Sequence, residues 1–217
     1  MALVIYDMDE TLLDADCSTL WIEYLIEQGM ADRDEILQKE KQLMQDYYQG
    51  NLKVEDYVTM QLKPTIGLSF EELEPHLERY VAEKIRPVIR QQARTNIARH
   101  KEQGDRCLII SASTEFLIQP IARELGIEDI IGIEIEIEQG RITGNISGIP
   151  SYQEGKVTRL EKWLSLNTEN MNNSWFYSDS HNDRPLLEKV TNPVAVNADE
   201  KLSRLATANG WLQVCWQ

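Results

Sequence analysis

The stretch Leu3-Val-Ile-Tyr6, followed directly by Asp7-Met-Asp9-Glu-Thr11, decides the fold. Its first four residues form an apolar run that indicates a buried strand. Because side chains alternate along an extended chain, Asp7 and Asp9 are expected on the same side. Neighbouring carboxylates repel each other, and a hard cation such as Mg²⁺, which takes oxygen ligands, removes that cost. An acidic turn after a strand gives the same local pattern, so distant residues must decide.

Three further segments carry matching side chains. Cys107-Leu-Ile-Ile110 indicates a second buried strand, and Ser111-Ala-Ser-Thr114 after it can bond a phosphate through hydroxyls and backbone N–H groups. Trp175-Phe-Tyr177 indicates a third strand, and Ser178-Asp-Ser-His-Asn-Asp183 follows it. Gly155-Lys156 opens a helix with apolar periodicity. Each segment alone has a structural explanation, such as a helix cap or a solvated lysine. Together, they predict one site built from three strand ends and a helix start.

This set of motifs resembles a known family. Asp7-Met-Asp9-Glu-Thr11, Ser111, Lys156 and Asp179-Ser-His-Asn-Asp183 are similar, in this order, to the four motifs of the haloacid dehalogenase-like hydrolases. The second aspartate of the first motif points to the phosphatases of that family. The layout resembles most the phosphoserine-phosphatase-like subfamily, including its histidinol-phosphate phosphatase-like bacterial branch, and the resemblance covers nearly all 217 residues.

The resemblance implies a mechanism. Asp7 would attack phosphorus and become an aspartyl-phosphate, and Asp9 would protonate the leaving group and then activate water. Mg²⁺ would be held by Asp7, by the backbone carbonyl of Asp9 and by Asp179, with Asp183 as an outer ligand. The residues expected to bind phosphate are Ser111, Ala112, Lys156 and Asn182, and Asn182 could instead anchor Lys156.

Recognition of the leaving group is expected to come from a helical cap. In phosphoserine phosphatases, an acid nine residues beyond the nucleophile reads the substrate ammonium group, and Asp16 occupies that position here. Asp16 could equally cap the helix that follows it. The cap arginine that reads a carboxylate in that subfamily aligns with Gln61. The substrate is therefore expected to be an amine-bearing metabolite phosphate, with histidinol phosphate first and phosphoserine second.

The order of elements predicts an α/β fold with a doubly wound parallel sheet and an inserted helical bundle. Residues 1–14 and 88–217 would form the core domain, and residues 15–87 the cap. Pro75 is expected to break or kink its helix, because proline lacks an N–H group. The expected helices start at Ser18 (to near Gly29), Asp32 (to near Gly50) and Ser69, and span 54–62, 93–103, 116–125, 156–166, 185–189 and 200–208. The expected strands are 3–6, 107–110, 130–138, 141–147, 174–178, 194–197 and 211–214.

Composition sets further bounds. The net charge of −14 argues against a nucleic-acid partner, because phosphate backbones attract basic surfaces. No apolar run approaches the roughly 18 residues that a membrane span needs, and no secretory signal is visible, so a cytoplasmic location is expected. Three scattered cysteines fit a reducing compartment. The expected partner is a small phosphorylated metabolite, and the oligomeric state is left open.

Two other functions share this pattern. A phosphotransferase would use the same residues and pass the phosphoryl group to a second alcohol. A phospho-accepting signalling domain also carries an acidic cluster, a hydroxyl and a lysine around one aspartate. Such a domain would lack Asp9 as a proton carrier and would not carry an insert of about seventy residues.

Overall fold

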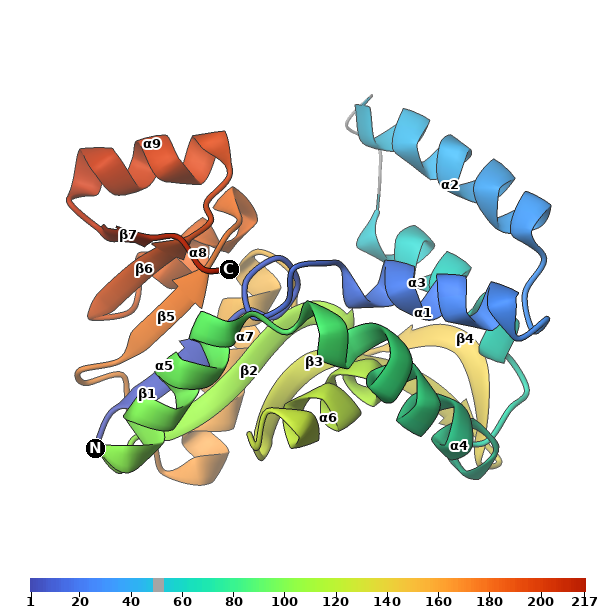
Figure 1. The fold of residues 1–217 in the computed structure, drawn as a ribbon, viewed down its shortest axis with the longest axis horizontal. Coiled ribbons are helices and arrows are strands. Elements are labelled where there is room, and N and C mark those ends of the chain that lie inside the picture. Colours follow the sequence, from blue (N-terminus) through green and yellow to red (C-terminus); the bar gives the residue numbers. More distant parts are fainter. Residues whose placement is uncertain (49–52) are drawn as a thin grey trace.

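The computed structural model describes residues 1–48 and 53–217, without the side chains of residues 40–42 and 44–48. In these ranges, seven strands form one sheet in the order β4-β3-β2-β1-β5-β6-β7 (Figure 1). All neighbouring strands are parallel except β3 and β4, which form the expected antiparallel hairpin. The strands are β1 (Leu3–Tyr6), β2 (Arg106–Thr114), β3 (Asp129–Glu138), β4 (Arg141–Ser147), β5 (Trp175–Ser178), β6 (Asn192–Val196) and β7 (Leu212–Val214). The predicted α/β class with a mainly parallel sheet is confirmed.

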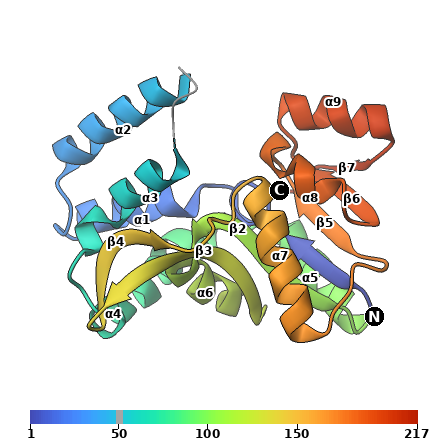
Figure 2. The ribbon, with the colours of Figure 1, turned by 180° about the vertical axis from the view of Figure 1, so that it is seen from behind.

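Helices cover both faces of the sheet because its central strand is apolar on both sides. Val4 and Tyr6 of β1 pack into a cluster with α5 (Gln91–Glu102) and α6 (Glu115–Glu124). Leu3 and Ile5, which alternate with them, pack on the other side. There they meet α7 (Glu154–Asn167), α8 (Arg184–Leu187) and α9 (Glu200–Asn209). Figure 1 shows α5 and α6 in front of the sheet, and Figure 2, the view from the opposite side, shows α7 in front of it.

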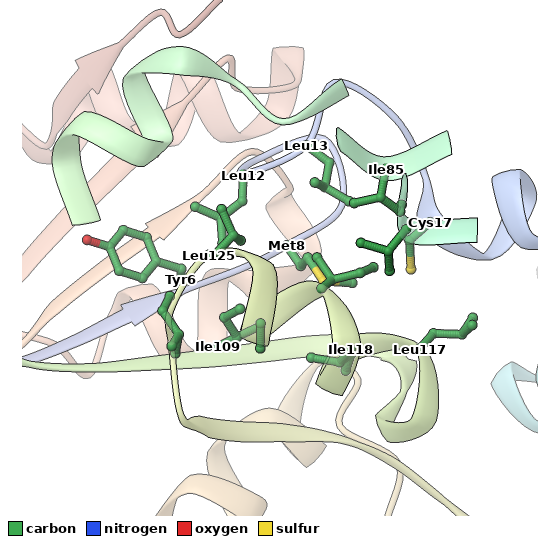
Figure 3. Packing of buried hydrophobic residues seen from close by; sticks show 14 of the residues in the cluster. Tyr6, Met8, Leu12, Leu13, Cys17, Ile85, Ile109, Leu117, Ile118 and Leu125 are labelled. Atoms are coloured by element: carbon green, nitrogen blue, oxygen red, sulfur yellow. The ribbon is translucent and has the colours of Figure 1, made fainter. Parts of the chain in front are cut away.

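The insert between β1 and β2 contains α1 (Cys17–Glu27), α2 (Arg33–Tyr48), α3 (Val54–Leu62) and α4 (Phe70–Tyr80). Its aromatic residues Trp21, Tyr24 and Tyr80 belong to the same buried cluster as β1 and α6, so the insert is packed onto the core. Figure 3 shows a part of this cluster, where residues of the loop after β1 meet β2 and α6. The domain boundaries at 14/15 and 87/88 stay a prediction.

Three local expectations need correction. Asp16 is the N-cap of α1 in place of Ser18, which lies inside the helix, since the Asp16 carboxylate accepts the Thr19 N–H at 2.6 Å. Pro75 does not break α4. It lies in the second turn, where it removes a single backbone hydrogen bond, and the capping box of Ser69 and Glu72 stabilises that end.

Strand β2 is longer than expected. It continues beyond Ile110 to Thr114, with a shift of register against β3 in between, and α6 starts at Glu115. Ser111 and Ser113 therefore lie in extended backbone two residues apart, which places both side chains on one side of the strand.

The expected end of the second helix near Gly50 and the side chain of Tyr47 lie outside the described residues. No helix in the described ranges is both long and apolar enough to cross a membrane.

Candidate active site

The site lies where the carboxyl ends of β1, β2 and β5 meet. Strand β1 lies in the middle of the sheet, with β2 to β4 on one side of it and β5 to β7 on the other. The strand order therefore changes direction at β1, and open α/β sheets bind ligands at such a switch point. The Asp7 N–H donates to the Tyr177 carbonyl of β5 at 2.9 Å, which fixes the start of the first motif against the last. The Thr11 hydroxyl donates to Asp179 Oδ1 at 2.9 Å and to Asp7 Oδ2 at 3.4 Å. The first and fourth motifs are thus joined as predicted.

Lys156 lies buried between two carboxylates. Its Nζ is 2.6 Å from Asp7 Oδ1 and 2.7 Å from Asp183 Oδ1, and its side chain is 3 % exposed. Burial alone would lower the pKa of Lys156, but the charges of Asp183 and Asp7 outweigh it and raise that pKa above its ordinary value. Ser178 also donates to Asp183 at 2.7 Å. Asp183 is therefore held by Lys156 and Ser178, which suits the outer position predicted for it.

Asp9 points to a different set of donors. Its Oδ1 accepts the Cys17 N–H at 2.7 Å, and its Oδ2 accepts the hydroxyls of Ser113 at 2.8 Å and Ser111 at 3.2 Å. Burial, together with the charge of Asp16, raises the pKa of Asp9 to about 6, although these hydrogen bonds oppose the rise. A carboxyl group with this pKa can carry a proton near neutral pH, which is the property that general acid–base work requires.

The carboxylates carry more negative charge than the protein compensates. Lys156 is the single cation among the described residues that line the cavity with Asp7, Asp179 and Asp183. Burial raises the pKa of Asp7 well above its ordinary value, and nearby carboxylates add to the rise against the opposing effect of Lys156. Burial also raises the pKa of Asp179 to about 6. Among the described residues, no three His, Cys, Asp or Glu side chains form a ready-made metal cluster. The surplus charge and the all-oxygen donor set nevertheless fit a hard divalent cation.

A cavity of about 550 Å³ lies over these residues. Ser111, Ala112, Lys156 and Asn182, which were predicted to bind phosphate, all line it. Asp16 and Gln61, which were predicted to read the leaving group, also line it. Asp16 caps α1 and also borders the cavity, and its reading of a substrate ammonium group stays a prediction. Of the described residues around the cavity, Lys156 alone is positively charged.

Several residues near the site have contacts that define their place in the structure. Asn182 accepts a hydrogen bond from Gln153 at 3.2 Å, while Lys156 contacts the carboxylates of Asp7 and Asp183. The roles considered for Asn182, binding phosphate or anchoring Lys156, stay predictions. His181 lies in the loop after β5, with its Nδ1 donating to Asp199 at 2.9 Å. Of the cap aromatics, Trp21 and Tyr24 are core residues. Tyr57 borders the cavity.

Several residues of the site make contacts that the motifs did not predict. Ser113 donates to Asp9, and its alternation with Ser111 was the available signal. Ser178 holds Asp183, and Cys17 positions Asp9 through its backbone N–H. Tyr152 and Gln153, which precede α7, also line the cavity, although neither belongs to one of the four motifs.

The family model for haloacid dehalogenase-like hydrolases matches residues 4–188. A histidinol-phosphatase of Neisseria meningitidis is 39 % identical over 213 residues, which cover 96 % of each chain. A phosphoserine phosphatase of Archaeoglobus fulgidus is 26 % identical over 94 % of this chain and 55 % of its own length. A crystal structure of a Bordetella pertussis protein of unknown function superposes with a TM-score of 0.92 at 36 % identity, covering 98 % of this chain and 97 % of the other. A substrate-bound phosphoserine phosphatase shares the fold, with a TM-score of 0.67 at 18 % identity, over 99 % and 91 %. The chain therefore belongs to the haloacid dehalogenase-like hydrolases, as an enzyme of their phosphatase type.

Proposed function

We propose that this enzyme hydrolyses a small phosphomonoester whose leaving group carries a positive charge, with histidinol phosphate as the first candidate and phosphoserine as the second. The charge of the cavity wall carries the proposal. Glu10, Asp16 and Gln61 border the cavity, and Gln61 aligns with the cap arginine that reads a carboxylate in the phosphoserine-phosphatase-like subfamily. A leaving-group ammonium would meet an opposite charge there, whereas a leaving-group carboxylate would meet none. The similarity to the Neisseria histidinol-phosphatase supports the same order of candidates.

The side chains divide the chemistry between them. Asp7 is the nucleophile, and Lys156, 2.6 Å away, neutralises charge on the transferring phosphoryl group and keeps Asp7 oriented. Asp9 gives its proton to the leaving alkoxide and then takes one from the water that hydrolyses the aspartyl-phosphate. Ser111 donates a hydrogen bond to a phosphate oxygen once the substrate displaces its present contact with Asp9.

Mg²⁺ is the cofactor that fits the donor set. Asp7, Asp179 and the backbone carbonyl of Asp9 would hold it, with Asp183 outside them. When bound, the ion neutralises negative charge between the nucleophile and the phosphate dianion. Thr11 and Lys156 keep the two carboxylate ligands in place through the contacts described above. A cytoplasmic location and a small-metabolite partner stay predictions from the sequence.

A phosphate-release assay with Mg²⁺ tests the proposal. We expect kcat/KM to be highest for histidinol phosphate, lower for phosphoserine, and lowest for esters without an amine. A preference for phosphoserine would contradict the assignment of the cavity wall. The same assay with an added alcohol separates hydrolysis from phosphoryl transfer, because a transferase would form a new ester in place of free phosphate.

A further inference from the structure

Gln153 has a backbone conformation that favours glycine. Its φ and ψ are 50° and −122°, and the Gly155 N–H donates to the Tyr152 carbonyl at 2.8 Å. These values describe the first central position of a type II′ turn, where φ and ψ are about +60° and −120°. A residue with a Cβ atom in such a sparsely populated region costs roughly 1–3 kcal/mol, and such residues cluster at functional sites.

The same turn contains a glycine at a different position. A Cβ atom on Gly155 would lie 1.9 Å from the Pro150 carbonyl oxygen, so close packing requires glycine there. The glycine at position 155 is therefore explained by close packing, whereas the positive φ occurs two residues earlier, at Gln153. Position 153 has the stronger conformational preference for glycine, yet it carries a side chain. That side chain is therefore expected to have a use which offsets the strain.

Gln153 lines the active-site cavity. Its Nε2 donates to Asn182 Oδ1 at 3.2 Å and to the Tyr152 hydroxyl at 3.2 Å. Asn182 belongs to the loop that carries Asp179 and Asp183, so Gln153 is tied to that loop and lines the same cavity. Within the described part of the chain, the side-chain carbonyl Oε1 of Gln153 accepts no hydrogen bond, so it is available to accept one from a ligand.

We propose that Gln153 is a specificity-determining residue whose Oε1 accepts a hydrogen bond from a nitrogen of the leaving group. The inference rests on the proposed function, and it adds a second recognition element, from the start of α7, to a cavity that Asp16 and Gln61 also line. Nε2 fixes the orientation of the carboxamide through Asn182, so Oε1 is presented to the leaving group in a defined direction. An amine-bearing leaving group thus contacts an acceptor from each domain.

The test compares Gln153→Gly with a matched control, Gln139→Gly. Gln139 also has a positive φ, of 51°, but lies exposed in the β3–β4 hairpin. Both variants relieve backbone strain, and only the first removes a cavity side chain. The readout is kcat/KM for histidinol phosphate divided by kcat/KM for p-nitrophenyl phosphate, whose leaving group has no N–H donor. A hydrogen bond to a charged group is typically worth about tenfold to a hundredfold in affinity.

We expect Gln153→Gly to lower this ratio by about that factor and Gln139→Gly to leave it at the wild-type value. Gln153→Glu keeps an acceptor oxygen and adds a negative charge, so the ratio should stay at the wild-type value or rise, although both esters lose activity when the donor to Asn182 is gone. Equal losses on both esters in Gln153→Gly, accompanied by a lower Tm, would identify a structural tether and overturn the inference. Wild-type enzyme that does not turn over histidinol phosphate would instead overturn the proposed function, and the inference with it.

Discussion

Replacing the active-site carboxylate Asp179 by asparagine should stabilise the metal-free fold while removing activity. The pKa of Asp179 rises from 3.8 to about 6 because burial, together with the charge of Asp183, disfavours its ionised form. Each pKa unit is worth about 1.4 kcal/mol, so the ionised group destabilises the folded chain by up to about 3 kcal/mol at neutral pH. Asparagine keeps an oxygen for the Thr11 hydroxyl, which now donates to Asp179 at 2.9 Å.

The sign of the pH dependence follows from linkage. An acid with a higher pKa in the folded state stabilises that state below its unfolded pKa near 4, and this contribution is lost as pH rises through about 6. In excess chelator, Asp179→Asn should therefore gain most over wild type above pH 6. Solvent relaxation reduces this value to about 1–2 kcal/mol, or roughly 2–8 °C in Tm for a chain of this size.

Thermal unfolding in chelator at pH 5 and pH 8 measures this effect. Asp199→Asn is the control of opposite sign. Partial burial of Asp199 acts to raise its pKa. Hydrogen bonds from His181 and from the Leu202 N–H outweigh this effect and hold the pKa of Asp199 below its ordinary value. Asp199→Asn should thus lower Tm. Added Mg²⁺ should raise the Tm of wild type more than that of Asp179→Asn, because ligand binding stabilises by mass action. Equal loss of Tm in both variants at pH 8 would refute the idea of a surplus charge at Asp179.

Three further predictions concern catalysis. Excess chelator should abolish phosphate release, and added Mg²⁺ should restore it. Asp7→Asn should abolish phosphate release even with Mg²⁺ present, because an amide is not a competent nucleophile; near wild-type turnover in this variant would show that Asp7 is not the nucleophile. Asp9→Asn should lower kcat by about 10²–10⁴-fold for alkyl esters, measured at steady state, since the proton carrier is lost; intact turnover would remove that role. Asp16→Asn should lower kcat/KM for histidinol phosphate by about tenfold to a hundredfold, and much less for p-nitrophenyl phosphate. A loss that is equal for both esters would make Asp16 only the cap of α1, and a wild-type preference for phosphoserine would reverse the order of substrates.

The sheet and the motif residues were predictable because each carries a strong local signal. Apolar runs bounded by polar residues marked β1, β2 and β5, and parallel strands bring their carboxyl ends to one edge. That edge brings Asp7, Ser111 and Asp179 together without any further information. The position of Lys156 followed from the helix start at Gly155. These are consequences of alternation and strand direction, which a single sequence expresses directly.

The contacts of Asp9 were less predictable because they depend on a strand irregularity. The sequence suggested that β2 ends at Ile110, whereas the strand continues with a shifted register to Thr114. The extension places Ser113 as well as Ser111 against Asp9. A register shift depends on pairing with β3, and pairing between distant segments leaves no periodic signal in either one.

Gln153 shows a different limit of sequence reasoning. Its conformation is imposed from outside, since Gly155 packs against Pro150 and Lys156 must reach Asp7 and Asp183. Nothing in the letters Tyr152-Gln-Glu-Gly155 distinguishes a strained turn from an ordinary helix start. The local preference for glycine at position 153 is visible only once φ is known. Where a structure violates a local preference beside a reactive site, the side chain that causes the violation is the one to test for function.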